Sequence, residues 1–154
     1  MSSTLRLVFA ASALAAALAP APLPAQAAPA ASQSAAADSL AYPRQFVSWI
    51  FSSQGDSAFA HAGPRLRESM KSGDGVNAMA AQILGRFGAM ERTDTEVQFD
   101  EGALKVYIAV LRFASAPEPG AWVVAYSPDT KVVERASFGP LSRVKTRYPQ
   151  AKLP

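Results

Sequence analysis

The sequence lacks cysteine altogether and has a single histidine, His61, among its 154 residues. Without cysteine the chain can form no disulfide, and it offers no thiol nucleophile, no iron–sulfur ligand and no sulfur ligand for zinc. One imidazole does not supply the nitrogen set of a transition-metal site, so any bound metal would have to sit among oxygen atoms. The sequence therefore predicts no metal and no cofactor.

The sequence also has only a small excess of positive charge, with 15 basic against 12 acidic residues and a formal net charge of +3. A nucleic-acid-binding surface needs a dense basic stripe that displaces counterions from phosphates. The sequence has no such stripe, and we do not expect nucleic acid as a partner. The hydrophobic fraction of 49% is instead typical of one modest globular domain joined to a compositionally biased segment.

The one long apolar run follows Arg6 and ends at Pro20. Its length of about 13 residues is too short for the roughly 20 that a helix needs to cross a bilayer core. A basic start, this apolar run and small residues before a cleavage point form the secretory signal pattern. We predict a signal peptide over residues 1–27, cleaved after Ala27 or, as a second choice, after Ala30. The mature chain would be periplasmic or extracellular, with no transmembrane segment.

Beyond the signal peptide, composition divides the chain into three parts. Residues 28–41 are rich in alanine, proline and serine and have almost nothing large to bury, which predicts a disordered leader. Residues 42–140 carry the aromatic and aliphatic patterning of one folded domain. Residues 141–154 have basic side chains and no acidic one, and we interpret them as a basic, solubilising C-terminal tail.

Apolar residues recur every three or four positions in the first half of the domain, as amphipathic helices require. This spacing predicts about three helices, the first from residue 43 to about residue 53. The second is interrupted at Gly63–Pro64 before it resumes. We expect Asp74 to cap the third helix and Gly88 to end it. The third helix has the clearest apolar stripe, made of Val76, Met79, Ala80, Ile83, Leu84 and Phe87.

The apolar period changes to two in the second half of the domain, which indicates strands. Four alternating segments separated by turn residues predict strands near residues 95–99, 104–110, 121–126 and 132–138. The short connections make consecutive strands antiparallel neighbours. Helices first and strands second give an α+β fold, with about three N-terminal helices packed on a four-stranded antiparallel meander.

Four features of the domain are similar to one known group. They are an aromatic first helix with Phe46 and Trp49, a Gly55–Asp56 step into the second helix, the pattern Leu84-Gly85-x-Phe87-Gly88 at the end of the third, and a meander that closes at Phe138-Gly139-Pro140. Over residues 43–140 the chain resembles small exported bacterial domains of unknown function in the nuclear-transport-factor-2-like, cystatin-like α+β group. The resemblance implies a cystatin-like α+β roll, most often non-catalytic, and it is compatible with a homodimer through the open sheet face.

No residue is predicted to be catalytic. A hydrolase triad needs a base that accepts a proton near neutral pH, and His61 is the single candidate. It lies at an irregular helix end, and no Gly-x-Ser-x-Gly elbow is present. Enzymes of the similar group use acids and histidines deep in the cone, and the sequence has no recognisable pairing of a buried Asp with a Tyr or His.

Two further patterns have simple structural interpretations. Asp94, Glu96, Asp100 and Glu101 are close in sequence and could offer oxygens to calcium, but they lack the ligand spacing of a calcium loop, so we favour ordinary solvated acids. Residues 73–75 precede a helix, as in a phosphate-binding loop. No strand comes before them, and an aspartate there would repel an anion, so we interpret them as a helix cap.

The candidate ligand-binding residues are Trp49, Tyr107, Arg112, Trp122 and Tyr126. If Trp122 and Tyr126 line the concavity between helices and sheet, an aromatic wall with Arg112 at its rim would hold an apolar or anionic small molecule. The alternative is that these aromatic residues pack in the core and that Arg112 is solvated. A shift of one residue in strand register would move the Trp122 side chain to the opposite face of the sheet.

These observations predict an exported, non-catalytic small domain that binds a small apolar or anionic ligand, or a protein partner, in the cell envelope. One alternative is a structural or accessory envelope protein that associates through a sheet edge or another surface. A second alternative is an enzyme of the same fold group, because a fold does not decide a function.

Overall fold

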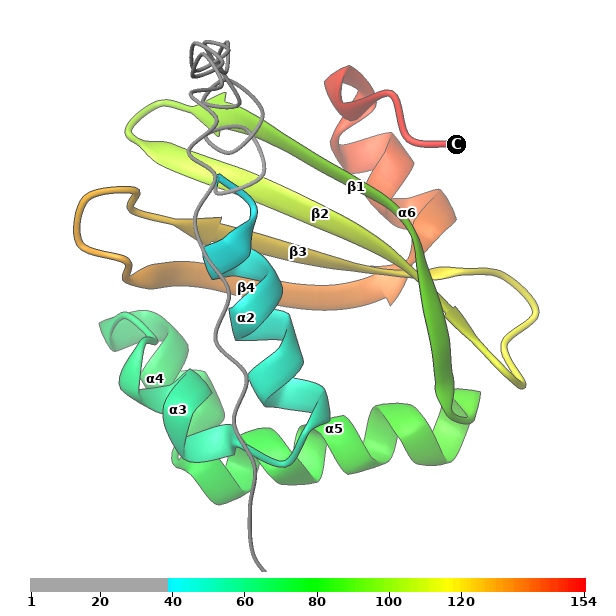
Figure 1. Ribbon diagram of the computed structural model, residues 1–154, viewed down its shortest axis with the longest axis horizontal. Coiled ribbons are helices and arrows are strands. Elements are labelled where there is room, and N and C mark those ends of the chain that lie inside the picture. Colours follow the sequence, from blue (N-terminus) through cyan, green and yellow to red (C-terminus); the bar gives the residue numbers. More distant parts are fainter. Residues whose placement is uncertain (1–38) are drawn as a thin grey trace, which may run out of the picture.

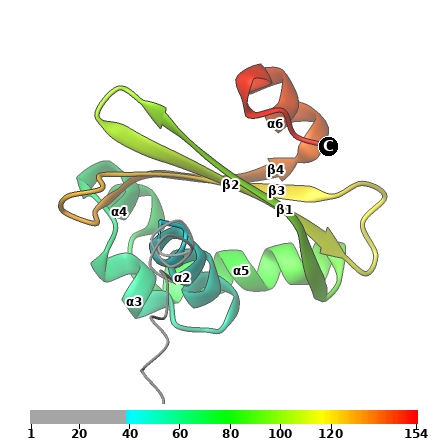
Figure 2. The same cartoon turned by 45° about the horizontal axis from the view of Figure 1, so that its top comes forward.

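The protein has three layers in a computed structural model that describes residues 39–154, with one sheet between two layers of helices (Figure 1). Helices α2 to α5 cover the face that we call inner, and α6 covers the opposite, outer face (Figure 2). The predicted signal peptide and nearly all of the predicted leader lie outside the described residues. The predictions of an α+β fold and of a four-stranded antiparallel sheet are confirmed.

In the part of the chain that the structure describes, the inner layer consists of four helices: α2 (Ala41–Phe51), α3 (Gly55–Ala60), α4 (Pro64–Met70) and α5 (Gly73–Phe87). In α2 the apolar spacing buries Phe46, Val47 and Ile50 against the sheet, as the periodicity predicts. Helix α4 begins with Pro64, which is favoured at the first helical position because its missing N–H has no partner to lose there. The proline and the preceding glycine thus separate α4 from α3.

The first residues of α3 and α5 are in direct contact. The Gly55 amide donates to Asn77 Oδ1 at 3.0 Å, which caps α3 from the side of α5. A β-carbon on Gly55 would lie only 2.1 Å from the Gly73 carbonyl oxygen. Because any larger side chain would push the two helices apart, this close approach requires glycine.

Helix α5 has a capped start and a glycine end. The cap is Ser72, whose hydroxyl accepts a hydrogen bond from the Gly75 amide at 3.2 Å. The expectation that Asp74 caps this helix was wrong; Asp74 lies in the first turn, where its charge favours the helix dipole. Gly88 follows the last helical residue with φ of 81°, a conformation that glycine adopts readily. The apolar stripe between these ends belongs to the inner core, where α5 packs against α2 and α3.

The sheet is a meander in the order β1-β2-β3-β4, with β1 (Met90–Glu101), β2 (Leu104–Phe113), β3 (Gly120–Tyr126) and β4 (Val133–Pro140). Strand β3 is buried along its whole length because helices cover both of its faces. Edge strand β1 is more exposed, and its pairing with β2 shifts register twice near its start. Such bulges bend a strand away from a flat edge.

The segment predicted as a basic tail contains helix α6 (Leu141–Arg147) and the short 3₁₀ helix η1 (Pro149–Ala151). Leu141, Val144 and Tyr148 are buried against the outer face of the sheet, while the basic side chains of α6 are exposed. This helix was not predicted from the sequence. Within residues 39–154, no helix combines the length and apolar character needed to span a bilayer.

Candidate functional site

Trp122 packs in the inner core and lines neither of the two pockets described below. It is 1% exposed and lies on the inner face of β3. Phe51 meets it edge-on at a centroid distance of 6.3 Å, and Phe138 lies at 5.8 Å. Its indole N–H is buried with no hydrogen-bond partner among the described residues. Trp122 therefore fills space in the core by packing against other aromatic rings. Core packing was one of the two alternatives that the sequence left open for this residue.

Trp49 and Tyr126 belong to an aromatic group around His61. The Trp49 ring stacks on His61 at 4.9 Å, and Tyr42 lies 5.8 Å from His61 and 5.1 Å from Tyr126. Tyr42 donates a hydrogen bond to the Lys131 carbonyl oxygen, and the Lys131 ammonium lies over the Tyr42 ring. Burial raises the pKa of Tyr42 to about 12. His61 is thus held among rings, and its Nδ1 lies 3.4 Å from the Lys131 carbonyl oxygen.

Arg112 forms an ion pair with Asp94. Its Nε and a terminal guanidinium nitrogen donate to Asp94 Oδ2 at 3.0 and 2.7 Å, and Arg92 donates to the other oxygen at 2.7 Å. These two hydrogen-bonded guanidinium groups hold the pKa of Asp94 below its usual value. Arg112 thus shares one carboxylate with Arg92. It lines neither of the two pockets described below.

The four clustered acids are each paired with a cation. The pairs are Asp94 with Arg92 and Arg112, Glu96 with Arg44, Asp100 with Lys105, and Glu101 with Arg135. No group of three or more acidic or histidine side chains within residues 39–154 is arranged to hold a metal ion. These pairs link β1 to α2, to β2 and to β4.

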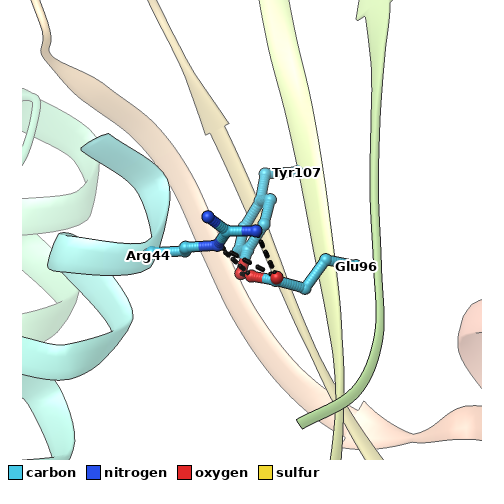
Figure 3. Close-up of polar contacts among 3 residues, drawn as sticks. All are labelled: Arg44, Glu96 and Tyr107. Atoms are coloured by element: carbon cyan, nitrogen blue, oxygen red, sulfur yellow. Dashed lines mark hydrogen bonds and ion pairs between the residues drawn. The ribbon is translucent and has the colours of Figure 1, made fainter. Parts of the chain in front are cut away.

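Of the five predicted ligand-binding residues, Tyr107 lines one of the two pockets described here, with partners that the sequence analysis did not assign to a ligand site. Figure 3 shows Arg44 from α2, Glu96 from β1 and Tyr107 from β2 converging at one point. Arg44 Nε lies 2.8 and 2.9 Å from the two Glu96 oxygens, and its terminal nitrogen lies 2.6 Å from Glu96 Oε2. The Tyr107 hydroxyl donates to Glu96 Oε1. We call these three residues the Arg–Glu–Tyr cluster.

The pKa shifts in the Arg–Glu–Tyr cluster are opposite to those of an acid–base catalyst. The Arg44 guanidinium hydrogen-bonded to Glu96 lowers the pKa of that carboxyl, so it stays ionised at neutral pH. Burial raises the pKa of Tyr107 well above its usual value, so the phenol stays protonated. A general acid or base works best when its pKa is near the operating pH. The hydrogen bonds of the cluster instead join α2 to the sheet.

The α2–β1 pocket, about 450 Å³ in volume, lies beside this cluster. Its apolar wall includes Val47, Phe51 and Leu111, and the Arg–Glu–Tyr cluster forms part of its polar lining. Because the charges of Arg44 and Glu96 neutralise each other, this lining has no net charge. The α2–β1 pocket therefore has little electrostatic attraction for an ionic ligand.

The α5–α6 pocket is larger, about 580 Å³, and lies where the C-terminal half of α5, the loop 114–119 and the start of α6 come together. Aromatic and aliphatic side chains line it, among them Met79, Ile83, Phe87, Phe113 and Phe138. Arg86, Glu118 and Arg143 supply charged groups. This volume lies in the range of small-molecule sites, which are usually apolar with a few polar groups.

Packing at Gly120 shapes the apolar wall of the α5–α6 pocket. A β-carbon on Gly120 would lie 2.5 Å from the Phe138 ring and 3.2 Å from Phe113. Phe138 therefore lies directly against the backbone of β3 and meets Phe113 and Phe87 edge-on at 5.6 and 5.7 Å. These contacts fix the rings before any ligand arrives, which reduces the ordering entropy that binding has to overcome.

The sequence analysis missed the α5–α6 pocket because its walls come from three separate segments, within residues 79–87, 113–120 and 138–143. Arg86 and Phe87 belong to α5, whereas Arg143 belongs to the segment interpreted as a tail. The one sequence signal was the apolar spacing of Leu141, Val144 and Tyr148, which indicates a helix and not a tail.

Comparison with protein-family models, with curated proteins and with solved structures gives no match. The geometry of the chain itself therefore carries the functional argument.

Proposed function

We propose that the protein is an exported, non-catalytic binding module of the cell envelope that holds a small apolar or amphiphilic molecule in the α5–α6 pocket. We extend the proposal to its fold relationship: the helices and meander form a cystatin-like roll of the nuclear-transport-factor-2-like type. The observation that carries the functional proposal is the preformed aromatic wall of this pocket, where Phe87, Phe113 and Phe138 are held by ring contacts and by the bare backbone of Gly120.

An enzymatic role has weaker support. His61 stacks on Trp49, and its Nδ1 lies near a backbone carbonyl oxygen. The pKa shifts of Glu96 and Tyr107 keep one ionised and the other protonated at neutral pH, so neither is poised to exchange a proton. These features favour binding over catalysis.

Association through the β1 edge of the sheet is also less well supported. The exposed edge strand β1 has two register shifts and several ion-paired side chains, including Asp94 and Glu96. Charges and bulges on an edge strand hinder pairing with a strand from another chain. A protein partner that binds elsewhere stays an alternative, and it would be retrieved by cross-linking in the envelope.

Ligand binding to the full chain tests the proposal. Thermal-shift and native mass spectrometry measurements with octyl and aryl compounds, both neutral and anionic, should find at least one ligand. Ala116→Phe places a ring into the pocket and should abolish the shift, whereas Ala114→Phe changes an exposed residue of the same loop that does not line the pocket and should not. Gln82→Trp is a second blocking variant at an exposed helical position that lines the pocket.

Circular dichroism and the unliganded melting temperature establish that each variant is folded before its binding is compared. If no compound of the panel binds the wild-type chain, the proposed function is wrong. The same conclusion follows if folded Ala116→Phe and Gln82→Trp variants bind as well as the wild type, because the ligand would then lie elsewhere.

A further inference from the structure

Within residues 39–154, two arginines of the α5–α6 pocket have no carboxylate partner. Among the described residues, Arg44, Arg92, Lys105, Arg112 and Arg135 form ion pairs, in which Arg92 and Arg112 share the carboxylate of Asp94. Within that same part of the chain, Arg86 and Arg143 enter no salt bridge, although both line one pocket. A pair of guanidinium groups beside an apolar wall is suited to an anionic group, because each presents several N–H donors in a planar arrangement.

The two arginines reach the pocket from different layers. Arg86 comes from the last turn of α5 in the inner layer, and its guanidinium lies over the Phe87 ring at 5.3 Å. Arg143 comes from α6 in the outer layer, which starts directly after β4. The ring contact places the Arg86 charge at the boundary between the aromatic wall and solvent. This arrangement suits a ligand with an apolar body and a charged end.

Glu118 limits how much negative charge the site can accept. Its carboxylate accepts hydrogen bonds from the backbone amide and the hydroxyl of Ser142 at 3.4 and 3.3 Å, and it lines the same pocket. Two arginines and one glutamate leave a net charge of about +1 among the lining side chains. A singly charged anion matches this value better than a doubly charged one, which Glu118 would repel more strongly.

We infer that the ligand of the α5–α6 pocket is a singly charged carboxylate with an apolar body, its carboxylate lying between Arg86 and Arg143 and its body against the phenylalanine rings. The inference rests on the proposed function and specifies its ligand class. The carboxylate gains charge-assisted hydrogen bonds, and the apolar body is removed from water. A neutral ligand of the same length retains only the burial of the apolar body, so the two contributions can be measured separately.

Isothermal titration of the full chain with four octyl compounds tests the inference: octanoate, octan-1-ol, octylamine and octyl phosphate, each below its micelle concentration. Octanoate should bind most tightly. Arg86→Gln and Arg143→Gln should each weaken octanoate binding about tenfold, the loss expected for one charge-assisted hydrogen bond, and leave octanol within about twofold. Arg65→Gln is the matched control, since Arg65 is exposed on α4 and does not line the pocket. Raising the salt concentration should weaken octanoate but not octanol.

The outcomes separate this inference from the proposed function. If octanol binds as tightly as octanoate and neither arginine variant matters, the carboxylate inference is wrong and the binding function stands. Tighter binding of octyl phosphate or octylamine also overturns the inference, because the charge preference would differ. If none of the four compounds binds, and the wider panel gives no ligand either, the proposed function fails as well.

Discussion

Glu96 is the residue that joins the helical layer to the edge of the sheet. It accepts hydrogen bonds from Arg44 on α2 and from Tyr107 on the neighbouring strand. The hydrogen bond from Arg44 lowers the pKa of the carboxyl below its usual value of 4.5. A lowered pKa in the folded state means that the unfolded chain binds the proton more readily. The stabilisation is therefore present above pH 4.5 and is lost as the pH falls through the folded-state value.

We predict that Glu96→Gln reduces the free energy of unfolding by about 1 kcal/mol at pH 7, a value kept small because Arg44 is half exposed. Urea denaturation at several pH values measures this effect. The gap between wild type and variant should narrow as the pH falls below 4.5, since Glu96 becomes protonated in the wild type. Glu91→Gln, at an exposed position on the same strand, is the control and should change little. A gap that stays constant down to acidic pH would contradict this account.

The sequence indicated which residues could form a ligand site but not where their side chains would lie. Alternation along β3 placed Trp122 and Tyr126 on one face, and the inner core contains both. Alternation does not tell whether that face is packed or hollow, because the answer depends on Phe51 and Phe138 from other elements. Of the five candidates, Tyr107 is the one that lines either of the two described pockets, and Arg86 and Arg143 were not predicted as site residues.

Among the elements, α5 shows how a helix end fixes the position of a pocket wall. Gly88 ends the helix with a positive φ, and the loop after β2 returns over this end, where the Ser115 amide donates to the Phe87 carbonyl oxygen at 2.9 Å. A β-carbon on Gly88 would lie 2.9 Å from Ser115 Oγ. The glycine therefore permits both the helix end and the path of the loop that borders the α5–α6 pocket.

We predict that Gly88→Ala lowers the free energy of unfolding by about 1–2 kcal/mol, because alanine is disfavoured at positive φ. Gly85→Ala should instead raise stability by about 0.5–1 kcal/mol, since Gly85 is helical and nothing lies within 4 Å of its added β-carbon. Thermal unfolding of the two variants measures both effects. Equal effects of the same sign would show that backbone conformation does not distinguish these two glycines.

The elements with a strong apolar period were predicted, whereas α6, whose apolar spacing is short and lies among basic residues, was not. The stripe of α5 and the alternation of the strands follow from local spacing, which packing then reinforces. Helix α6 has only seven residues, and its exposed basic side chains outnumber its buried apolar ones. Its existence depends on the outer face of the sheet, to which Leu141 and Val144 attach it. Short helices without such packing are marginal in water.

On the scale of the whole molecule, the sheet has two separate cores. The inner core lies under α2 to α5, and the outer core joins Val106, Ile108 and Val123 to α6 and η1. The outer face is apolar along its central strands, so exposing it to water would be costly. The basic segment is thus part of the folded domain and covers that face.

We predict that Val144→Asp lowers the free energy of unfolding by about 3 kcal/mol or more, since it puts an unpaired charge at a buried position. Thr146→Asp adds the same charge at an exposed position of α6 and should cost less than about 1 kcal/mol. Urea denaturation gives both values. If the two variants are equally stable, α6 does not cover the outer face as described.

Strand β3 is the element most affected if the layers separate. Its sequence, Gly-Ala-Trp-Val-Val-Ala-Tyr, has no charge and no proline, and all seven residues are buried. Segments of this composition self-associate into intermolecular sheets when they reach solvent. Removal of the outer helix would expose one apolar side of this strand, while β2 and β4 still pair with its backbone. Partial opening of this molecule would therefore favour aggregation. Helix α6 prevents this by covering the outer face of β3.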